Sequence, residues 1–165
     1  MSEYEILYSA LNLSHEDFSG LFSNKAEAEM LRPELESVIE ISERLIKPQG
    51  IISIFDAVEV NVDGFRVEDV YFECGRKIAG LLRGSEKIAV FVCTIGAEIV
   101  SAYKRSTASG DWLRAYFFDT LGSLAVERTM DIIQKQLKKE LSENNLRMTN
   151  RFSPGYCNWL VKEQK

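Results

Sequence analysis

The residues best suited to chemistry lie near the end of the chain, in the stretch Arg151–Tyr156, which reads Arg-Phe-Ser-Pro-Gly-Tyr. Arg151 offers a planar fork of donors that matches a carboxylate, and Tyr156 offers an aromatic face with a hydroxyl donor. Pro154 pre-sets its own φ and Gly155 can adopt a positive φ, so the pair predicts a turn that a ligand can approach closely. Two interpretations stay open: a ligand-binding turn, or an ordinary loop of common composition.

Length and composition indicate a soluble globular protein. The 165 residues are 45% hydrophobic and 27% charged, as in folded chains with a sizeable core. The net charge of -5 argues against a nucleic-acid partner engaged by bulk electrostatics. No run approaches the ~18 apolar residues of a membrane span, and the acidic N-terminus lacks the regions of a signal peptide. We therefore expect a cytoplasmic protein with no nucleic-acid or membrane partner.

Three cysteines and one histidine limit the catalysis that this chain can perform. Cys74, Cys93 and Cys157 match no zinc or redox spacing, which predicts unpaired thiols in a reducing compartment. His15 follows Ser14 near an expected helix start, and one imidazole cannot form a metal cluster. We expect neither a metal site nor a serine or cysteine catalytic triad.

The N-terminal part, residues 1–48, is expected to be helical. Residues 4–11 predict a short helix, and Ser14–Asp17 predicts an N-cap followed by first-turn acids. A longer helix near 26–46 contains Pro33, which kinks it or restarts it. After this proline, residues at helical spacing predict a buried face opposite a solvated glutamate face: Leu35, Val38, Ile39, Ser42, Leu45 and Ile46.

The middle of the chain predicts a β-hairpin and a buried strand. Residues 51–62 alternate with period two through Val58, Val60 and Val62, and Asp63-Gly64 fits a type I′ turn into a second strand with Phe65, Val67 and Val70. Residues 72–83 predict a helix with three inward side chains, Ile78, Leu81 and Leu82. The continuous apolar run at 87–96 predicts a strand buried on both faces. Thr94–Gly96 then leads into a helix near 97–105, whose N-terminus can hold an anion.

Asp111 is expected to cap a long helix, about 111–143, which precedes a short strand at 146–150. Its predicted apolar stripe consists of Leu113, Phe117, Leu121, Leu124, Met130, Ile133, Leu137 and Leu141. Glu127 falls between Leu124 and Met130, on or near the inward face, where a carboxylate needs a partner or a ligand. The alternative is a pair with Arg128, Arg114 or another cation at the edge of the core.

These elements predict a single α+β domain over residues 1–165. Its helical N-terminal part is 1–48, and its α+β core is 49–165. We expect a mainly antiparallel sheet with a β-hairpin and a buried strand, flanked by helices that include the long helix near 111–143.

The C-terminal stretch also carries a family resemblance. Arg151–Tyr156, followed by Glu163-Gln164-Lys165, resembles the Arg-x-x-Pro-Gly-Tyr…Glu-Lys signature of the activation domain of cobalamin-dependent methionine synthase. The resemblance covers most of the chain and includes stand-alone members of the family. Weaker similarities lie at Tyr4–Leu7, at Thr94–Gly96 and in the long helix at Asp119, Gly122 and Glu127. The family continues past this signature with further strands, so the core at 49–165 is expected to be a C-terminally shortened form.

The resemblance implies a protein that binds S-adenosylmethionine and supports reductive methylation of cob(II)alamin. The cobalamin would be carried by a separate methionine synthase or other corrinoid protein, and a flavodoxin-type donor would supply the electron. The chain would then be an accessory to methyltransferase activity rather than an independent catalyst. By resemblance, Arg151 would meet the methionine carboxylate, Glu127 its ammonium, and the backbone around Ser153 and Gly155 the ligand, with Tyr156 beside it. One cation and one anion suit a zwitterion.

The chain departs from the family pattern at two positions. Asn145 stands near the place of a second acidic ligand, and Cys157 stands where the family has proline. The main alternative function is a non-catalytic interaction module that docks on a corrinoid protein without binding the methyl donor. A third hypothesis is a domain that holds another anionic ligand at the turn Thr94–Gly96.

Overall fold

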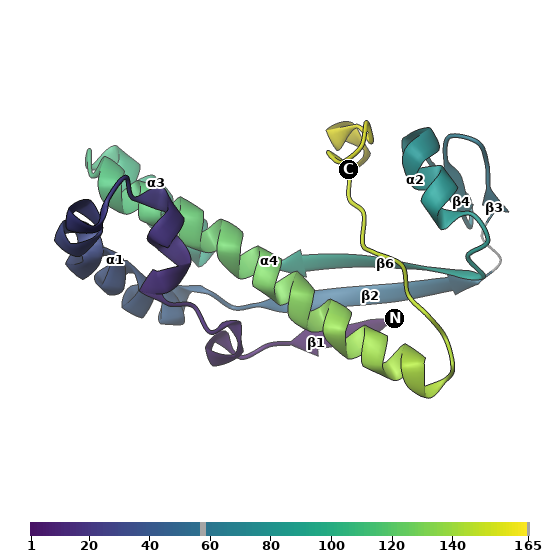
Figure 1. Cartoon of the computed structure of the whole chain (residues 1–165), viewed down its shortest axis with the longest axis horizontal. Coiled ribbons are helices and arrows are strands. Elements are labelled where there is room, and N and C mark those ends of the chain that lie inside the picture. The colour runs from purple at the N-terminus through teal and green to yellow at the C-terminus, as the bar shows by residue number, and fades with distance from the viewer. Residues whose placement is uncertain (57–58, 165) are drawn as a thin grey trace. The chain divides into compact units, whose positions relative to one another are not determined.

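The computed structural model describes residues 1–56 and 59–164 and has an α+β architecture (Figure 1). The predicted α+β class and the long helix are confirmed, whereas Val58 and Lys165 lie outside the described residues. The elements in chain order are β1 (Ser2–Glu5), 3-10 helices η1 (Tyr8–Leu11) and η2 (His15–Leu21), α1 (Lys25–Leu45), β2 (Gln49–Asp56), β3 (Glu59–Val60), β4 (Phe65–Val67), β5 (Val70–Phe72), α2 (Gly75–Leu82), β6 (Lys87–Thr94), α3 (Glu98–Ala108), α4 (Trp112–Glu143) and η3 (Val161–Gln164).

The chain divides into two compact units, and each unit collects segments that are distant in sequence. Unit 1 consists of Met1–Ser2, Ile52–Phe91 and Leu137–Lys165, and unit 2 consists of Glu3–Ile51 and Val92–Gln136. The dividing points fall within β1, β2, β6 and α4, so each of these elements contributes residues to both units.

Two three-stranded sheets contain the described strands. The first has the order β1-β2-β6, and β2 runs opposite to both of its neighbours (Figure 1). The prediction that the strand at 87–96 is buried on both faces is wrong, because several side chains of β6 are exposed, with Val92 at 68%. β6 is also an edge strand of its sheet. An apolar run predicts a strand, but it does not reveal whether other elements cover both of its faces.

The first residues form a strand where a helix was predicted. Tyr4 and Glu5 belong to β1, and only Tyr8–Leu11 forms a 3-10 helix. The Ile6 N–H donates to Pro48 O at 3.0 Å, which continues the contact between the start of the chain and the segment that leads into β2. Hydrogen bonds to a distant segment outweigh a weak local helix preference.

Local signals set the first longer helices as predicted. Ser14 N–H donates to the Asp17 carboxylate at 2.9 Å and completes a capping box for η2. Helix α1 is capped by Asn24, whose side chain accepts from the Glu27 N–H at 3.0 Å. The helix continues through Pro33, so of the two alternatives predicted there, a kink or a restart, the restart does not occur.

The predicted hairpin is confirmed only around its connection, where β3 pairs with β4. Most of the predicted first strand forms β2 in the other sheet, and Val70 of the predicted second strand belongs to β5. The turn is also different. Strands β3 and β4 pair in antiparallel fashion up to Val60 and Phe65, so residues 61–64 form the connection. The Asn61 N–H donates to Gly64 O at 2.8 Å across this loop. Gly64 does not have the positive φ that a type I′ turn requires.

Gly64 is needed for space rather than for a left-handed backbone. A Cβ at this position would lie 2.4 Å from Phe72 O, a backbone atom of the second hairpin. Beside it, Tyr71 Oη donates to Asp63 Oδ1 at 2.9 Å. This hydrogen bond, together with burial and the nearby carboxylate charge, raises the pKa of the Tyr71 phenol above its ordinary value.

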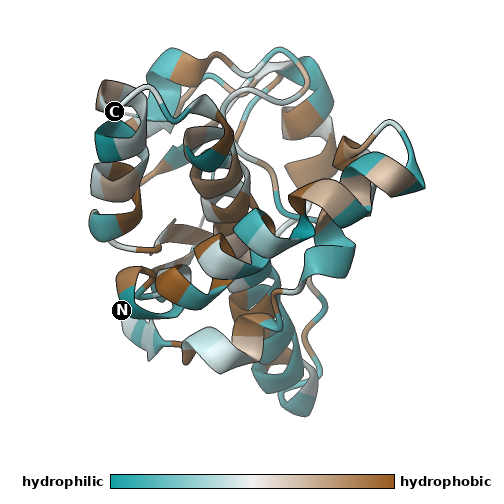
Figure 2. Ribbon diagram, turned by 90° about the vertical axis from the view of Figure 1, so that its left-hand side faces the viewer, coloured by the Kyte–Doolittle hydropathy of each residue, from teal (hydrophilic) through white to brown (hydrophobic). Residues whose placement is uncertain are grey.

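Helix α2 is shorter than the predicted helix at 72–83, since Phe72 ends β5. Ile78 is buried as predicted and Leu82 is half-buried, but Leu81 is exposed and Ala79 takes its expected place in the core. Figure 2 shows hydrophobic residues (brown) and hydrophilic residues (teal) on the same turns of the helices, as expected for helices with one buried face.

Helix α4 supplies much of the core of unit 2. Asp111 caps it as predicted, since its side chain accepts from the Arg114 N–H at 3.1 Å. Phe117 and Leu121 are almost completely buried, while Leu113 at the start of the predicted stripe is 37% exposed. Across the described residues, every helix is either too short or too polar to cross a membrane.

We expect Leu121→Ala to lower the free energy of unfolding by about 2–5 kcal/mol, because it leaves a cavity in a packed core. Leu113→Ala on the same helix is the matched control and should cost less than about 1 kcal/mol. Urea unfolding followed by circular dichroism measures both. Equal losses in the two variants would contradict the burial of Leu121.

We expect Gly64→Ala to lower the free energy of unfolding by about 1–3 kcal/mol, because its Cβ would collide with backbone. Gly80→Ala is the control, since nothing lies within 4 Å of the Cβ added there, inside α2. It should instead stabilise the protein by up to about 1 kcal/mol through helix propensity. Thermal unfolding compares the two signs, and stabilisation by Gly64→Ala would refute the close approach.

Candidate functional site

The stretch Arg151–Tyr156 forms the turn that its composition predicts. Tyr156 N–H donates to Ser153 O at 3.1 Å, with Pro154 and Gly155 at the two central positions. Gly155 has a φ of 103°, and a positive φ after a proline is what a type II turn requires. The expected short strand at 146–150 is wrong, since these residues have no regular structure.

Trp159 closes the loop that follows this turn. Its N–H donates to Tyr156 O at 2.8 Å, and its carbonyl oxygen accepts from the Gly155 N–H at 2.6 Å. The amides of Gly155 and Tyr156 are therefore both used within the loop. A carbonyl oxygen has two lone pairs, so the backbone of this turn can offer acceptors to a ligand more readily than these two donors.

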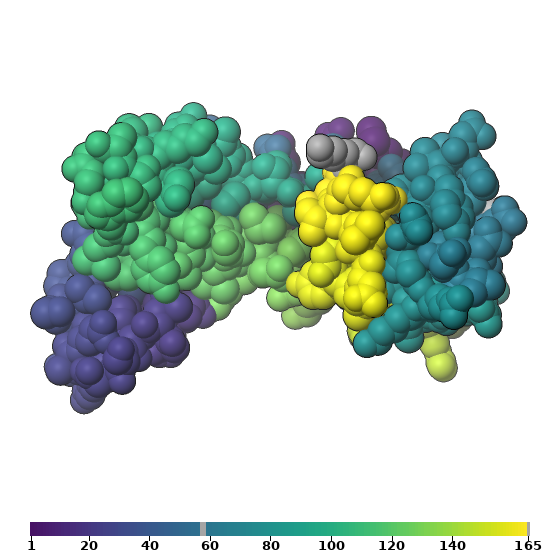
Figure 3. Space-filling model, turned by 90° about the horizontal axis from the view of Figure 1, so that it is seen from above, coloured from purple at the N-terminus to yellow at the C-terminus, as the bar shows by residue number. Residues whose placement is uncertain are grey.

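An aromatic cluster connects this loop to the hairpins of unit 1. The Trp159 ring meets the rings of Phe65 and Phe72 edge-on, at centroid distances of 6.0 and 6.5 Å. Phe65 and Phe72 stack on each other at 4.9 Å. Figure 3 shows the C-terminal residues in yellow against the teal residues of the hairpins and α2. The turn is therefore packed against a folded core and is not part of a loose tail.

The side chains of the turn differ in exposure. Tyr156 is 61% exposed, while Arg151 and Ser153 are half-buried. Arg151 makes an interaction of its own within the structure, and its guanidinium carries more than one donor edge. An exposed phenol ring and a half-buried guanidinium on one short loop can contact an aromatic or carboxylate-bearing ligand.

Glu127 does not face inward, which corrects the prediction for this residue. Helix α4 has buried positions at every fourth residue, namely Leu121, Ala125, Thr129, Ile133 and Leu137. Glu127 lies two residues from Ala125 and from Thr129, which is about 200° around the helix from each, and it is exposed. Leu124 and Met130 are half-buried and lie beside the core stripe. The prediction took both as part of the inward face, and it therefore placed Glu127 between them on that face. Glu127 belongs to unit 2 and the turn to unit 1.

Two arginines that were considered as partners of Glu127 hold other groups. Arg128 donates to Leu11 O at 2.6 Å, and it also contacts Asn12 O and the Asp17 carboxylate. Arg114 pairs with Glu34 at 2.7 Å. These contacts fasten α4 to the N-terminal helices of unit 2.

The turn Thr94–Gly96 has a structural explanation. The Gly96 N–H donates to Thr94 Oγ1 at 3.1 Å, and Ile95 O accepts from the Lys47 N–H at 2.9 Å. Helix α3 then starts with Glu98 in its first turn, and this carboxylate already interacts favourably with the helix N-terminus. The arrangement does not favour a second anion there.

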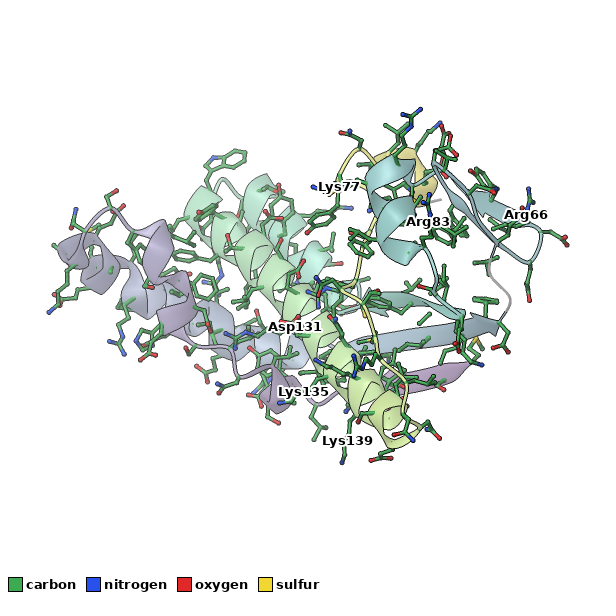
Figure 4. All side chains as sticks on the ribbon, turned by 45° about the vertical axis from the view of Figure 1, so that its right-hand side comes forward. Arg66, Lys77, Arg83, Asp131, Lys135 and Lys139 are labelled. Atoms are coloured by element: carbon green, nitrogen blue, oxygen red, sulfur yellow. The ribbon has the colours of Figure 1, made fainter. Side chains whose placement is uncertain are left out.

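Further charged side chains and a hollow lie elsewhere among the described residues. Arg66, Lys77 and Arg83 project from β4 and from α2 and its end, and Asp131, Lys135 and Lys139 follow one another along α4 (Figure 4). A hollow of about 430 Å³ lies between η2 and α1 in unit 2, with charged residues in its lining. Its cations are paired, for example Arg32 with Glu36 at 2.7 Å, so it offers no strong anion site.

The cysteines differ sharply in environment. No disulfide joins the three, all of which the structure describes; Cys74 is buried and Cys157 is exposed directly after the turn. Burial raises the pKa of the Cys74 thiol above its ordinary value.

Sequence reasoning did not identify Trp159 as part of the site. The signal available in the sequence was a tryptophan three residues after Tyr156.

The geometry defines an α+β protein in which an Arg-Phe-Ser-Pro-Gly-Tyr turn is closed by a buried tryptophan. No family model and no curated protein sequence matches the chain. Among solved structures, it is similar to the reactivation domain of MetH bound to AdoHcy, with a TM-score of 0.66 and 15% sequence identity. The likeness covers 94% of this chain and 64% of that one. The chain therefore shares the fold of that domain and spans less than two thirds of its length.

We expect a thiol reagent such as iodoacetamide to label Cys157 rapidly in the native protein at pH 8 and to label Cys74 slowly. Cys74 is both shielded and held in the unreactive thiol form, since its raised pKa disfavours the thiolate. Mass spectrometry of digested samples measures the two rates, and urea should abolish the difference. Equal native rates would contradict the burial of Cys74.

Proposed function

We propose that this chain binds S-adenosylmethionine and serves as a reactivation component for a cobalamin-dependent methionine synthase or a related corrinoid protein. The observation that carries this proposal is the closed turn Arg151–Tyr156, with Gly155 at positive φ, in a chain with the fold of the MetH reactivation domain. That domain is bound to AdoHcy, which is the demethylated counterpart of S-adenosylmethionine.

Each side chain of the turn has a role that suits its chemistry. Arg151 would bind the methionine carboxylate, because its guanidinium matches a carboxylate fork to fork. The carbonyl oxygens of Ser153 and Gly155 would accept from ligand N–H and O–H groups, and the exposed ring of Tyr156 would lie beside the ligand. Glu127 was assigned to the ammonium by resemblance alone, and its exposed side chain adds no support.

The chain's own contribution to the reaction would be position. S-adenosylmethionine would donate its methyl group to the cobalamin that the partner carries and would leave as AdoHcy. A flavodoxin-type protein would supply the one electron that reduces cob(II)alamin beforehand. The turn would hold S-adenosylmethionine in one orientation, which lowers the entropic cost of the transfer. The protein would therefore be an accessory to a methyltransferase, active in the cytoplasm.

Isothermal titration with S-adenosylmethionine tests this proposal directly. We expect the wild type to bind and Arg151→Ala to weaken binding by about 10- to 100-fold, the effect of losing hydrogen bonds to a charged group. Arg147→Ala is the matched control, because Arg147 is an exposed arginine in the segment that leads to the turn. It should bind like the wild type.

The proposal would be contradicted if the wild type showed neither binding heat nor a thermal shift at saturating S-adenosylmethionine. The remaining hypothesis would then be an interaction module that docks on a corrinoid protein. That alternative expects Arg151→Ala and the wild type to be retained equally by an immobilised corrinoid protein.

A further inference from the structure

We infer that Trp159 is the positioning residue of the turn Arg151–Tyr156: it fixes the backbone geometry that a ligand meets and anchors it to the hairpin core. The role in ligand binding rests on the proposed function, whereas the anchoring of the turn can be tested without any ligand.

The backbone of Trp159 contacts the turn in both directions. Its carbonyl oxygen accepts from the Gly155 N–H at 2.6 Å, and its N–H donates to Tyr156 O at 2.8 Å. Gly155 can adopt a wide range of φ values, so its conformation of 103° needs an external restraint. The hydrogen bond to Trp159 O is such a restraint, and it acts on the residue that gives the turn its shape.

The side chain of Trp159 ties this restraint to a rigid partner. Trp159 is only 8% exposed, and its ring meets Phe65 and Phe72 at interplanar angles of 81° and 85°. Phe65 and Phe72 are register partners on β4 and β5, so the hairpin sets the position of both rings. Movement of Trp159 would break two edge-to-face contacts at once. These contacts therefore hold its backbone against the turn.

The indole N–H takes no part in this anchoring. Trp159 Nε1 is buried and has no hydrogen-bond partner among the described residues. An unsatisfied buried donor lowers stability rather than raising it. The ring therefore acts through its aromatic edges and its volume, and phenylalanine should reproduce most of the effect whereas alanine should not.

Amide hydrogen exchange measured by NMR tests the anchoring. We expect Trp159→Ala to speed exchange of the Gly155 amide by at least about tenfold, because the loop then opens locally. Trp159→Phe should stay within about threefold of the wild type. Amides of helix α4 near Leu121, in unit 2, serve as the internal control for global unfolding, because Trp159 belongs to unit 1. An unchanged Gly155 amide in Trp159→Ala would overturn the inference, whether or not S-adenosylmethionine binds.

Titration of the same variants tests the consequence for the ligand. Given binding by the wild type, Trp159→Ala should weaken it by at least about tenfold and Trp159→Phe by less than about threefold. Wild-type affinity in Trp159→Ala would overturn the role in binding. An equal loss of affinity in Trp159→Ala and Trp159→Phe, with the Gly155 amide still protected from exchange, would also overturn it. Both variants lack the indole N–H, so that group would then act on the ligand itself.

A fluorescence measurement covers the case in which Trp159→Ala fails to fold. Trp112→Phe removes the exposed tryptophan of α4 and leaves Trp159 as the single tryptophan. S-adenosylmethionine should then change the emission of Trp159, because the ligand would contact a loop that is bonded to it. No change at a concentration that saturates binding by calorimetry would overturn the inference.

Discussion

The edge-to-face contact of Trp159 with the stacked pair Phe65 and Phe72 is the interaction on which unit 1 depends. Strands β3, β4 and β5 are two or three residues long, and such short hairpins are not stable in water without further packing. Aromatic pairs contribute about 0.5–1.5 kcal/mol beyond the area that they bury. The C-terminal segment thus completes the core of the hairpins, and the hairpins in turn hold the C-terminal turn.

Contacts between segments that are distant in sequence also hold unit 2 together. Helix α4 buries Phe117 and Leu121 in the core, and Arg128 on the same helix binds carbonyl oxygens and a carboxylate of the N-terminal helices. The arginine and the Asp17 carboxylate are 27% and 19% exposed, so solvent screens their attraction only in part. Apolar burial supplies the main stabilisation here, and the charged contacts select one arrangement of the N-terminal helices on α4.

The two lines of support for S-adenosylmethionine binding have different origins. The Arg-to-Tyr signature is a property of the sequence, whereas the likeness to the MetH reactivation domain is a property of the tertiary structure at 15% identity. The signature forms the Pro154-Gly155 turn, in which the N–H groups of Gly155 and Tyr156 are both used internally. A ligand would therefore be selected by side chains and carbonyl acceptors, which suits a molecule that has both a carboxylate and several donors.

Interactions within a few residues could be predicted from the sequence. The cap at Asp111, the span of α4 and the turn after Ser153 involve partners three or four positions away, where residue type decides the geometry. The edge position of β6, the loop at 61–64, the exposure of Glu127 and the anchoring by Trp159 were not predictable in this way. Each depends on which distant segment packs alongside, and no local preference encodes that choice.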